Sequence, residues 1–188
     1  MKKECFMKLA KEAGIKDCYE KWLDFMGDHV DFWLKDSEVH TKLHCARVML
    51  YALMIGKEQN LSKDAMEVLA QAAAFHDSRR QDDWLDIGHG GRAAIYYEAY
   101  CKENPQVRYD EITKLIMAYH DRDDAEGIQK IQEKNLTDGV LLYQIFKDAD
   151  GLDRFRLGEN ALDVRMLRTR EAKELVEFAK NTVDCTNC

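Results

Sequence analysis

The feature that most constrains this chain is the spacing of its apolar residues, which recur every three or four positions almost throughout. No stretch alternates apolar and polar residues for long enough to indicate a strand. Residues that interrupt helices are scarce, because the chain has a single proline, Pro105, and ten glycines. A length of 188 residues suits one domain. We therefore expect one compact all-α domain.

The apolar pattern divides the chain into a series of expected helices. They cover about 3–13, 17–35, 37–56, 62–77, 92–102, 104–120, 128–132, 137–150 and 170–182. Ser37 and Ser62 resemble helix N-caps, and Asn104 with Pro105 resembles an N-cap followed by proline at the first helical position. Residues 78–91 are polar and contain three of the glycines, which indicates a long loop of the kind that often carries function.

We expect a core of residues 37–170, with helices of 1–36 packed on it and a last helix and tail in 171–188. The net charge is −7 and there is no basic block, so a broad surface for duplex nucleic acid is not expected. No run of 18 apolar residues predicts a membrane span. The start lacks a secretory signal, and six cysteines then indicate free thiols in the cytoplasm. The sequence is compatible with a monomer or a homodimer.

Several histidines and aspartates stand at expected helix ends or on helix faces. They are His44, the pair His76-Asp77, His89, His120 and Asp150. Imidazole and carboxylate groups suit first-row divalent metals. The only cysteine among them, Cys45, points away from the face of His44, which argues against a structural zinc site. Taken singly, each histidine is explained at least as well by a structural role.

Three segments in order carry a family resemblance: His44-Cys45-Ala46-Arg47-Val48, Ala74-Phe75-His76-Asp77 and Lys147-Asp148-Ala149-Asp150-Gly151-Leu152-Asp153. Together they resemble the HD-domain superfamily of metal-dependent phosphohydrolases, over about residues 38–157. The resemblance implies an all-α fold of the HD type. It also implies a metal site formed by His44, His76, Asp77 and Asp150, with Asp148 as the alternative to Asp150.

Two further segments are similar to a branch of the superfamily with additional ligands. His89-Gly90-Gly91-Arg92-Ala93-Ala94 resembles its HG-x-x-(G/S)-A helix start, and residues 116–120 loosely resemble its I-x-x-H. The resemblance then implies a second metal held by His89, His120 and a bridging Asp77. The alternative is one metal, with His89 and His120 acting on the phosphate or as a general acid. The expected cofactor is thus one or two divalent ions of Mn, Fe, Co, Ni or Zn.

The implied activity is hydrolysis of a phosphomonoester or phosphodiester by metal-bound hydroxide, in a phosphorylated small molecule such as a nucleotide. Asp77, His120 and Arg79 are the expected catalytic residues. Substrate contacts are expected from His40, Arg47, Arg80, Lys147 and Arg154, because guanidinium groups match phosphate and His40 lies one helical turn before His44. Each of these side chains is equally compatible with a solvated or structural role. Asp86 or Asp121 is a candidate acceptor for a ligand imidazole.

Two other functions are compatible with the same residues. One is a di-iron oxygenase-like enzyme, which would also use two metals. The other is a nucleotide-sensing module without catalysis, although the presence of every expected ligand of the first site argues against it. Arg80 stands where the branch that hydrolyses guanosine alarmones has a glutamate, so that substrate is not expected.

Overall fold

A computed structural model describes residues 2–35, 37 and 41–187, and every regular element within these ranges is helical. The prediction of an all-α domain is therefore confirmed. The α-helices are α1 (Lys2–Glu12), α2 (Lys16–His29), α3 (Lys42–Glu58), α4 (Lys63–Phe75), α5 (His89–Glu103), α6 (Glu111–Tyr119), α7 (Asp124–Glu133), α8 (Gly139–Leu152), α9 (Arg170–Glu174) and α10 (Val176–Asn187). Two short 3-10 helices, η1 (Asp153–Leu157) and η2 (Val164–Met166), connect α8 to α9.

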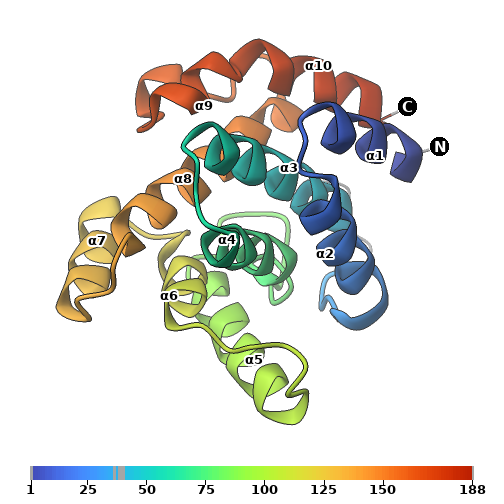
Figure 1. Cartoon of the computed structure of the whole chain (residues 1–188). Coiled ribbons are helices and arrows are strands. Elements are labelled where there is room, and N and C mark those ends of the chain that lie inside the picture. Colours follow the sequence, from blue (N-terminus) through green and yellow to red (C-terminus); the bar gives the residue numbers. More distant parts are fainter. Residues whose placement is uncertain (1, 36, 38–40, 188) are drawn as a thin grey trace.

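Helix α3 forms the centre of the molecule, between α4 and α8 (Figure 1). Residues 44–53 of α3 are all buried, so this helix is covered on every side. Helix α2 packs on α3 and α4, α1 lies against α2 and the far part of α10, and α5, α6 and α7 follow one another on the opposite side. The burial of α3 places its first turn, with His44, in the interior.

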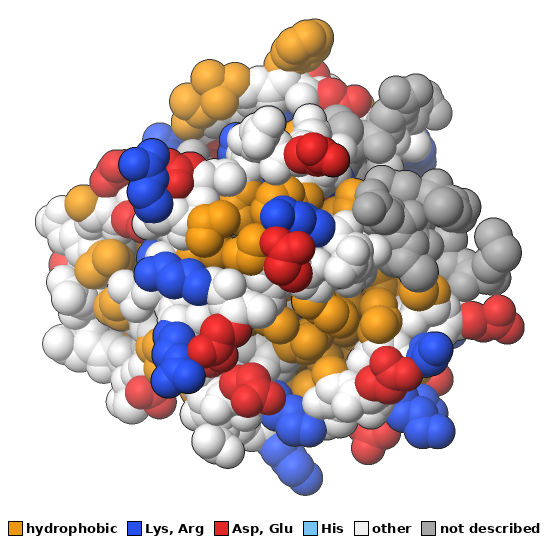
Figure 2. All heavy atoms as spheres, turned by 90° about the horizontal axis from the view of Figure 1, so that it is seen from above, with side chains coloured by type: hydrophobic (Ala, Val, Ile, Leu, Met, Phe, Trp, Pro, Cys, Tyr) orange, Lys and Arg blue, Asp and Glu red, His pale blue; other side chains and the backbone are white. Residues whose placement is uncertain are grey.

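The surface above this core is mixed. Figure 2 looks onto the side that carries α9 and α10 and shows hydrophobic side chains near its middle, with charged side chains around them. Partly buried hydrophobic residues here, Val176 and Phe178 of α10 and Leu175 between the two helices, pack against the core. In the described part of the chain, no helix is both long and apolar enough to cross a membrane.

The helix starts agree only in part with the sequence. Ser62 is the N-cap of α4, where its hydroxyl accepts a hydrogen bond from the Ala65 amide. Helix α3 begins at Lys42 and is capped by Thr41 rather than by Ser37. The prediction that Asn104 and Pro105 start a helix is wrong. Asn104 ends α5 with two hydrogen bonds to the Tyr100 carbonyl, and α6 is capped later by Asp110.

The loop before α5 covers 76–88 and so begins and ends earlier than the expected 78–91. Helix α5 starts at His89, after Gly88, whose positive φ of 96° lies in the left-handed region that glycine tolerates. At the other end of the chain the single expected helix is divided at Leu175 into α9 and α10. The early start of α5 matters for the site, because it makes His89 a helical residue.

Candidate metal centre

Six side chains from five helices converge on one place. His44 lies in the first turn of α3, His76 and His120 follow the last residues of α4 and α6, His89 opens α5, and Asp150 lies in the last turn of α8. Asp77 follows His76 directly. All are buried except Asp150, whose side chain is 31% exposed. The structure thus brings together the six residues that the family resemblance implied as metal ligands, with Asp150 rather than its alternative Asp148.

The four histidines meet through their Nε2 atoms. His44 Nε2 lies 3.2 Å from His76 Nε2, and His89 Nε2 lies 2.9 Å from His120 Nε2. The two aspartates lie against the same atoms. Asp77 Oδ1 is 3.0 Å from His89 Nε2 and its Oδ2 is 3.5 Å from His44 Nε2, while Asp150 Oδ1 is 3.3 Å from His44 Nε2.

The opposite nitrogen of each ring fixes its tautomer. Nδ1 of His76, His89 and His120 donates to the carbonyl oxygens of Ala73, Asp86 and Met117 at 3.0, 2.7 and 2.7 Å. Because a carbonyl oxygen can only accept, each Nδ1 carries the hydrogen and each neutral ring presents a lone pair at Nε2. At His89 this lone pair faces Arg80 Nη1 at 3.3 Å.

His44 is oriented in the same way by a carboxylate, because its Nδ1 lies 2.6 Å from Asp153 Oδ2. In the neutral rings the two close Nε2–Nε2 contacts would bring lone pairs together, which is repulsive unless a proton or a cation lies between them. A ring of nitrogen lone pairs and carboxylate oxygens is a donor set that suits a divalent transition metal.

Two triads of donor atoms have the spacing of a metal site. One is His44, His76 and Asp150, and the other is His76, Asp77 and His120; within each, the candidate atoms all lie within 4.8 Å of one another. The buried His/Asp groups therefore fit a metal ion. His76 belongs to both triads, and His89 lies beside the second through its contacts with Asp77 and His120.

The electrostatics of the cluster favour ionised carboxylates. Burial acts to raise the pKa of Asp77, but the neighbouring histidines outweigh it and hold that pKa well below its usual range. The same balance, dominated on the lowering side by His44, depresses the pKa of Asp150. Burial lowers the pKa of His76 to about 3, so this ring is neutral at ordinary pH.

The pKa values of His44 and His120 are raised, in contrast to that of His76. Burial opposes the charged form of His44 and His120, yet hydrogen bonds to Asp150 and Asp153 raise the pKa of His44, and the bond to Asp77 raises that of His120. The negative cluster thus attracts protons to these two nitrogens. A metal ion bound there would have to displace such protons, which couples metal affinity to pH.

Asp153 is a candidate site residue to which the sequence analysis gave no role. It is fully buried, and it accepts from His44 Nδ1 and from Arg47, whose Nε lies 2.5 Å from Oδ1 and whose Nη2 lies 3.1 Å from Oδ2. Arg156 adds a second cation 3.6 Å from Oδ2. The available signal was its position three residues after Asp150, but nothing in the sequence links it to His44.

The three other candidate aspartates, Asp148, Asp121 and Asp86, differ in whether they contact the cluster. Asp148, the alternative to Asp150, is fully buried and accepts from the amides of Arg168 and Thr169 and from the Thr169 hydroxyl, so it anchors the start of α9 and lies outside both triads. Asp121, a candidate acceptor for a ligand, has Oδ2 3.4 Å from His89 Nδ1. Its buried Oδ1 accepts no hydrogen bond from the described residues. The Asp86 carboxylate binds Arg92 instead.

The cluster forms one wall of a cavity of about 570 Å³, called the site cavity below. Its lining carries six cationic residues: Arg80, Arg122, Lys147, Arg154, Arg156 and Arg168. Arg80 and Lys147 are anchored beside the ligands. Arg80 Nη1 lies 3.9 Å from Asp77 Oδ1, and Lys147 Nζ donates to the His120 carbonyl at 2.9 Å. Of the six, Arg122 and Arg154 are exposed.

Two residues that were expected at the substrate or in catalysis, Arg79 and Arg47, are placed otherwise. The Arg79 guanidinium donates to the Asp31 carbonyl at 2.5 Å and lies over the Tyr96 ring, away from the described lining of the site cavity. Two positions after Asp77, this side chain is directed toward the N-terminal segment, so we assign it a structural role. Arg47 is likewise buried against Asp153. His40 lies outside the described residues.

Comparison with known proteins adds no further identification, because the chain matches no model of a protein family, no curated protein and no solved structure. The geometry of the cluster and of the site cavity is therefore the basis for a functional assignment.

Proposed function

We propose that the protein is a metal-dependent phosphohydrolase of the HD type that cleaves a phosphoester in a small molecule such as a nucleotide. The observation that carries this proposal is the combination of two features in one cavity. The lining presents the imidazoles of His44, His89 and His120, the carboxylates of Asp77 and Asp150, and six cationic side chains. The fully buried His76 contacts His44 Nε2 at 3.2 Å. A donor set of this kind fits a divalent ion, and the cations fit the negative oxygens of a phosphoester.

The metal would be held by His44, His76, Asp77 and Asp150, with His89 and His120 beside Asp77 as ligands for a second ion. A divalent ion supplies an acidified water and a Lewis acid for a phosphoryl oxygen. Asp77 is suited to bridging, because its Oδ1 faces His89 and its Oδ2 faces His44. Asp153 and the three backbone carbonyls keep the imidazoles in the ligand tautomer.

The cationic side chains of the cavity lining are the proposed contacts for the anionic substrate. Arg80 is buried and fixed by a 2.6 Å bond to the Trp84 carbonyl, so its charge lies close to Asp77 without side-chain freedom to lose. Arg122 and Arg154 are exposed at the cavity and can reorganise around phosphate oxygens. This arrangement favours hydrolysis of an anionic ester over oxygenation at a di-iron centre, which has no need of a cationic lining.

The test begins with metal content. The protein is purified without chelator, and its metal is measured by elemental analysis beside Asp77→Asn and a control, Asp163→Asn, which removes an exposed carboxylate from the same cavity. We expect one or two equivalents of a transition metal in the wild type and the control, and a loss in Asp77→Asn. Two equivalents would favour His89 and His120 as ligands.

Activity is then assayed on 4-nitrophenyl phosphate, bis(4-nitrophenyl) phosphate and a panel of nucleotides. Metal-dependent release of product by the wild type and the control, absent from Asp77→Asn, is the expected result. The proposal fails if the protein binds no metal after anaerobic reconstitution with Mn, Fe, Co, Ni and Zn, or if Asp77→Asn hydrolyses the same substrates equally well.

A further inference from the structure

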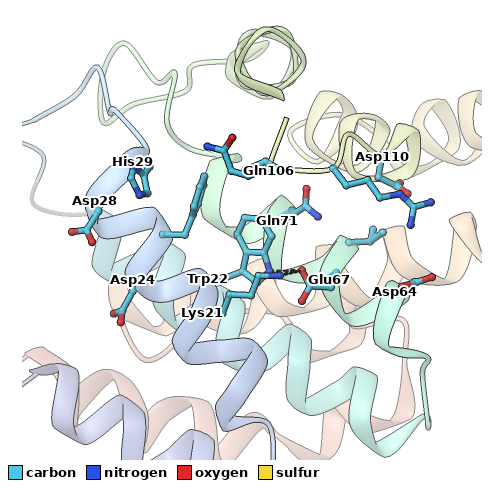
Figure 3. A pocket seen from close by; sticks show the side chains of 14 residues that line it. Lys21, Trp22, Asp24, Asp28, His29, Asp64, Glu67, Gln71, Gln106 and Asp110 are labelled. Atoms are coloured by element: carbon cyan, nitrogen blue, oxygen red, sulfur yellow. Dashed lines mark hydrogen bonds and ion pairs between the residues drawn. The ribbon is translucent and has the colours of Figure 1, made fainter. Parts of the chain in front are cut away.

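A second pocket, the α2–α4 pocket, opens on a different side of the molecule from the metal cluster. It has a volume of about 610 Å³, within the usual range for small-molecule sites, and lies between α2, α4 and the segment 106–110 that precedes α6. None of its lining residues lines the site cavity. Figure 3 shows Gln71 near its middle, with Trp22 and Glu67 close by and Asp28 and His29 on the α2 side.

Gln71 provides this pocket with a buried, hydrogen-bonded polar side chain. The residue is 5% exposed, and its Oε1 accepts a 2.8 Å hydrogen bond from the Tyr97 hydroxyl, which itself accepts from the Asp110 amide. The Tyr97 hydroxyl also lies 3.3 Å from the Arg108 carbonyl, and its shorter bond to Gln71 orients the side-chain amide with Oε1 toward Tyr97. Its Nε2 donates to no described residue, and the side chain lines the pocket. A nearly buried amide that presents a free donor calls for a hydrogen-bond acceptor on a ligand.

The charged and aromatic residues of the lining indicate the charge of the ligand and the kind of group that would pack in the pocket. It includes five carboxylates against two side chains of permanent positive charge, and one of those two, Lys21, is paired with Glu67 at 2.6 Å. Asp28 forms no ion pair with another described residue. Between the charged rims the lining is apolar and aromatic, with Trp22 and Phe25 in edge-to-face contact at 5.0 Å.

We propose that the α2–α4 pocket binds a small aromatic cation that carries a hydrogen-bond acceptor, as in a hydroxyaryl-alkylammonium. The ring would pack on Phe25 and Trp22, the acceptor would receive the Gln71 Nε2–H, and the ammonium would lie toward Asp28. This site is independent of the metal centre and of the reaction proposed there.

The test uses tyramine as the probe and isothermal titration calorimetry on the full chain. We expect a Kd of about 1 mM or tighter. Phenethylamine, which lacks the hydroxyl group, should bind about 5-fold more weakly, since it forgoes one hydrogen bond. The anion 3-(4-hydroxyphenyl)propionate, which keeps the hydroxyl group but reverses the charge, should not bind measurably.

Variants locate the site. Gln71→Leu should weaken tyramine about 5-fold and leave phenethylamine unchanged, a comparison that a general loss of folding would not reproduce. Asp28→Asn should weaken both amines about 2- to 5-fold, whereas Glu126→Gln, a carboxylate on α7, serves as the control for charge. The inference is overturned if neither amine binds, if the anion binds equally well, if Gln71→Leu weakens both amines alike, or if Asp77→Asn abolishes binding, which would place the amine at the metal cluster.

Discussion

Gly90 and Gly91, neighbours in the first turn of α5, offer a matched test of how the metal centre is assembled. A Cβ on Gly90 would lie 2.2 Å from the Met117 carbonyl oxygen and 2.8 Å from His120 Nδ1, whereas a Cβ on Gly91 would meet nothing within 4 Å. The Met117 carbonyl is the acceptor that orients His120. Gly90→Ala should therefore disturb the contact between α5 and α6, and Gly91→Ala should not.

The expected difference in free energy of unfolding follows from the effects that the two variants share and those that only Gly90→Ala has. Both gain roughly 0.5–1 kcal/mol from replacing glycine inside a helix. Gly90→Ala alone incurs overpacking against backbone, about 1–3 kcal/mol, and the loss or distortion of the Met117–His120 hydrogen bond, about 1 kcal/mol. The free energies of unfolding of the two variants should thus differ by about 2–4 kcal/mol, or about 4–16 °C in Tm for a chain of this size.

Urea denaturation gives the free energies of unfolding, calorimetry gives Tm, and elemental analysis gives bound metal. Gly91→Ala should be as stable as the wild type or slightly more so and keep its metal, while Gly90→Ala should be less stable and lose metal because His120 moves away from His89. A difference below about 0.5 kcal/mol between the two variants would refute the reasoning, since it would mean that α5 and α6 do not approach as closely as the cluster requires.

Three other predictions follow from the contacts around the core. Asp153→Asn leaves buried Arg47 without its ion pair and should cost about 3–5 kcal/mol in urea unfolding, whereas Asp31→Asn, in an exposed 3.8 Å pair with Lys35, should cost about 0–1 kcal/mol. Hydrogen bonds from Lys102 and Lys114 lower the pKa of Glu98 to about 2 from 4.5, so its contribution to stability is present above pH 4.5 and is lost as the pH falls toward 2. Glu98→Gln should make the urea midpoint fall less steeply across that range; an unchanged slope would contradict this account. A divalent ion at about 100 times its Kd should stabilise the wild type by about 2.7 kcal/mol in thermal unfolding and leave Asp77→Asn unshifted.

The sequence was sufficient for the fold class because apolar periodicity reports directly on which helix faces are buried. It was less informative about where helices begin. Asn104 and Pro105 have the chemistry of a helix start, but the Asn104 amide groups instead satisfy the Tyr100 carbonyl at the end of α5. A capping side chain can serve either the helix before it or the helix after it, and only tertiary packing decides which.

The same difference between local sequence signals and tertiary packing explains which site residues the sequence predicted. The six candidate ligands were identifiable because their residue types and order resemble a known pattern. The role of Asp153 was not, because it depends on the approach of η1 to the first turn of α3, far apart in sequence. Arg79 illustrates the converse: adjacency to the His-Asp pair suggested a substrate contact, yet its guanidinium packs on Tyr96.

The histidines differ in the group that accepts their Nδ1–H. This difference indicates which supporting residue matters most for ring orientation. His76, His89 and His120 each donate Nδ1–H to the carbonyl of the residue three positions earlier, so the backbone at a helix end holds the ring whatever side chain that residue carries. His44 lies inside the first turn of α3, at the start of its buried stretch 44–53, where the Thr41 side chain caps the backbone. Its acceptor is the distant Asp153 carboxylate. A substitution of Asp153 therefore removes the main Nδ1 acceptor of His44, whereas Asp121, 3.4 Å from His89 Nδ1, lies farther from that ring than its backbone acceptor. Loss of this acceptor should free the His44 ring to change tautomer, which would lower metal affinity by about 10- to 100-fold.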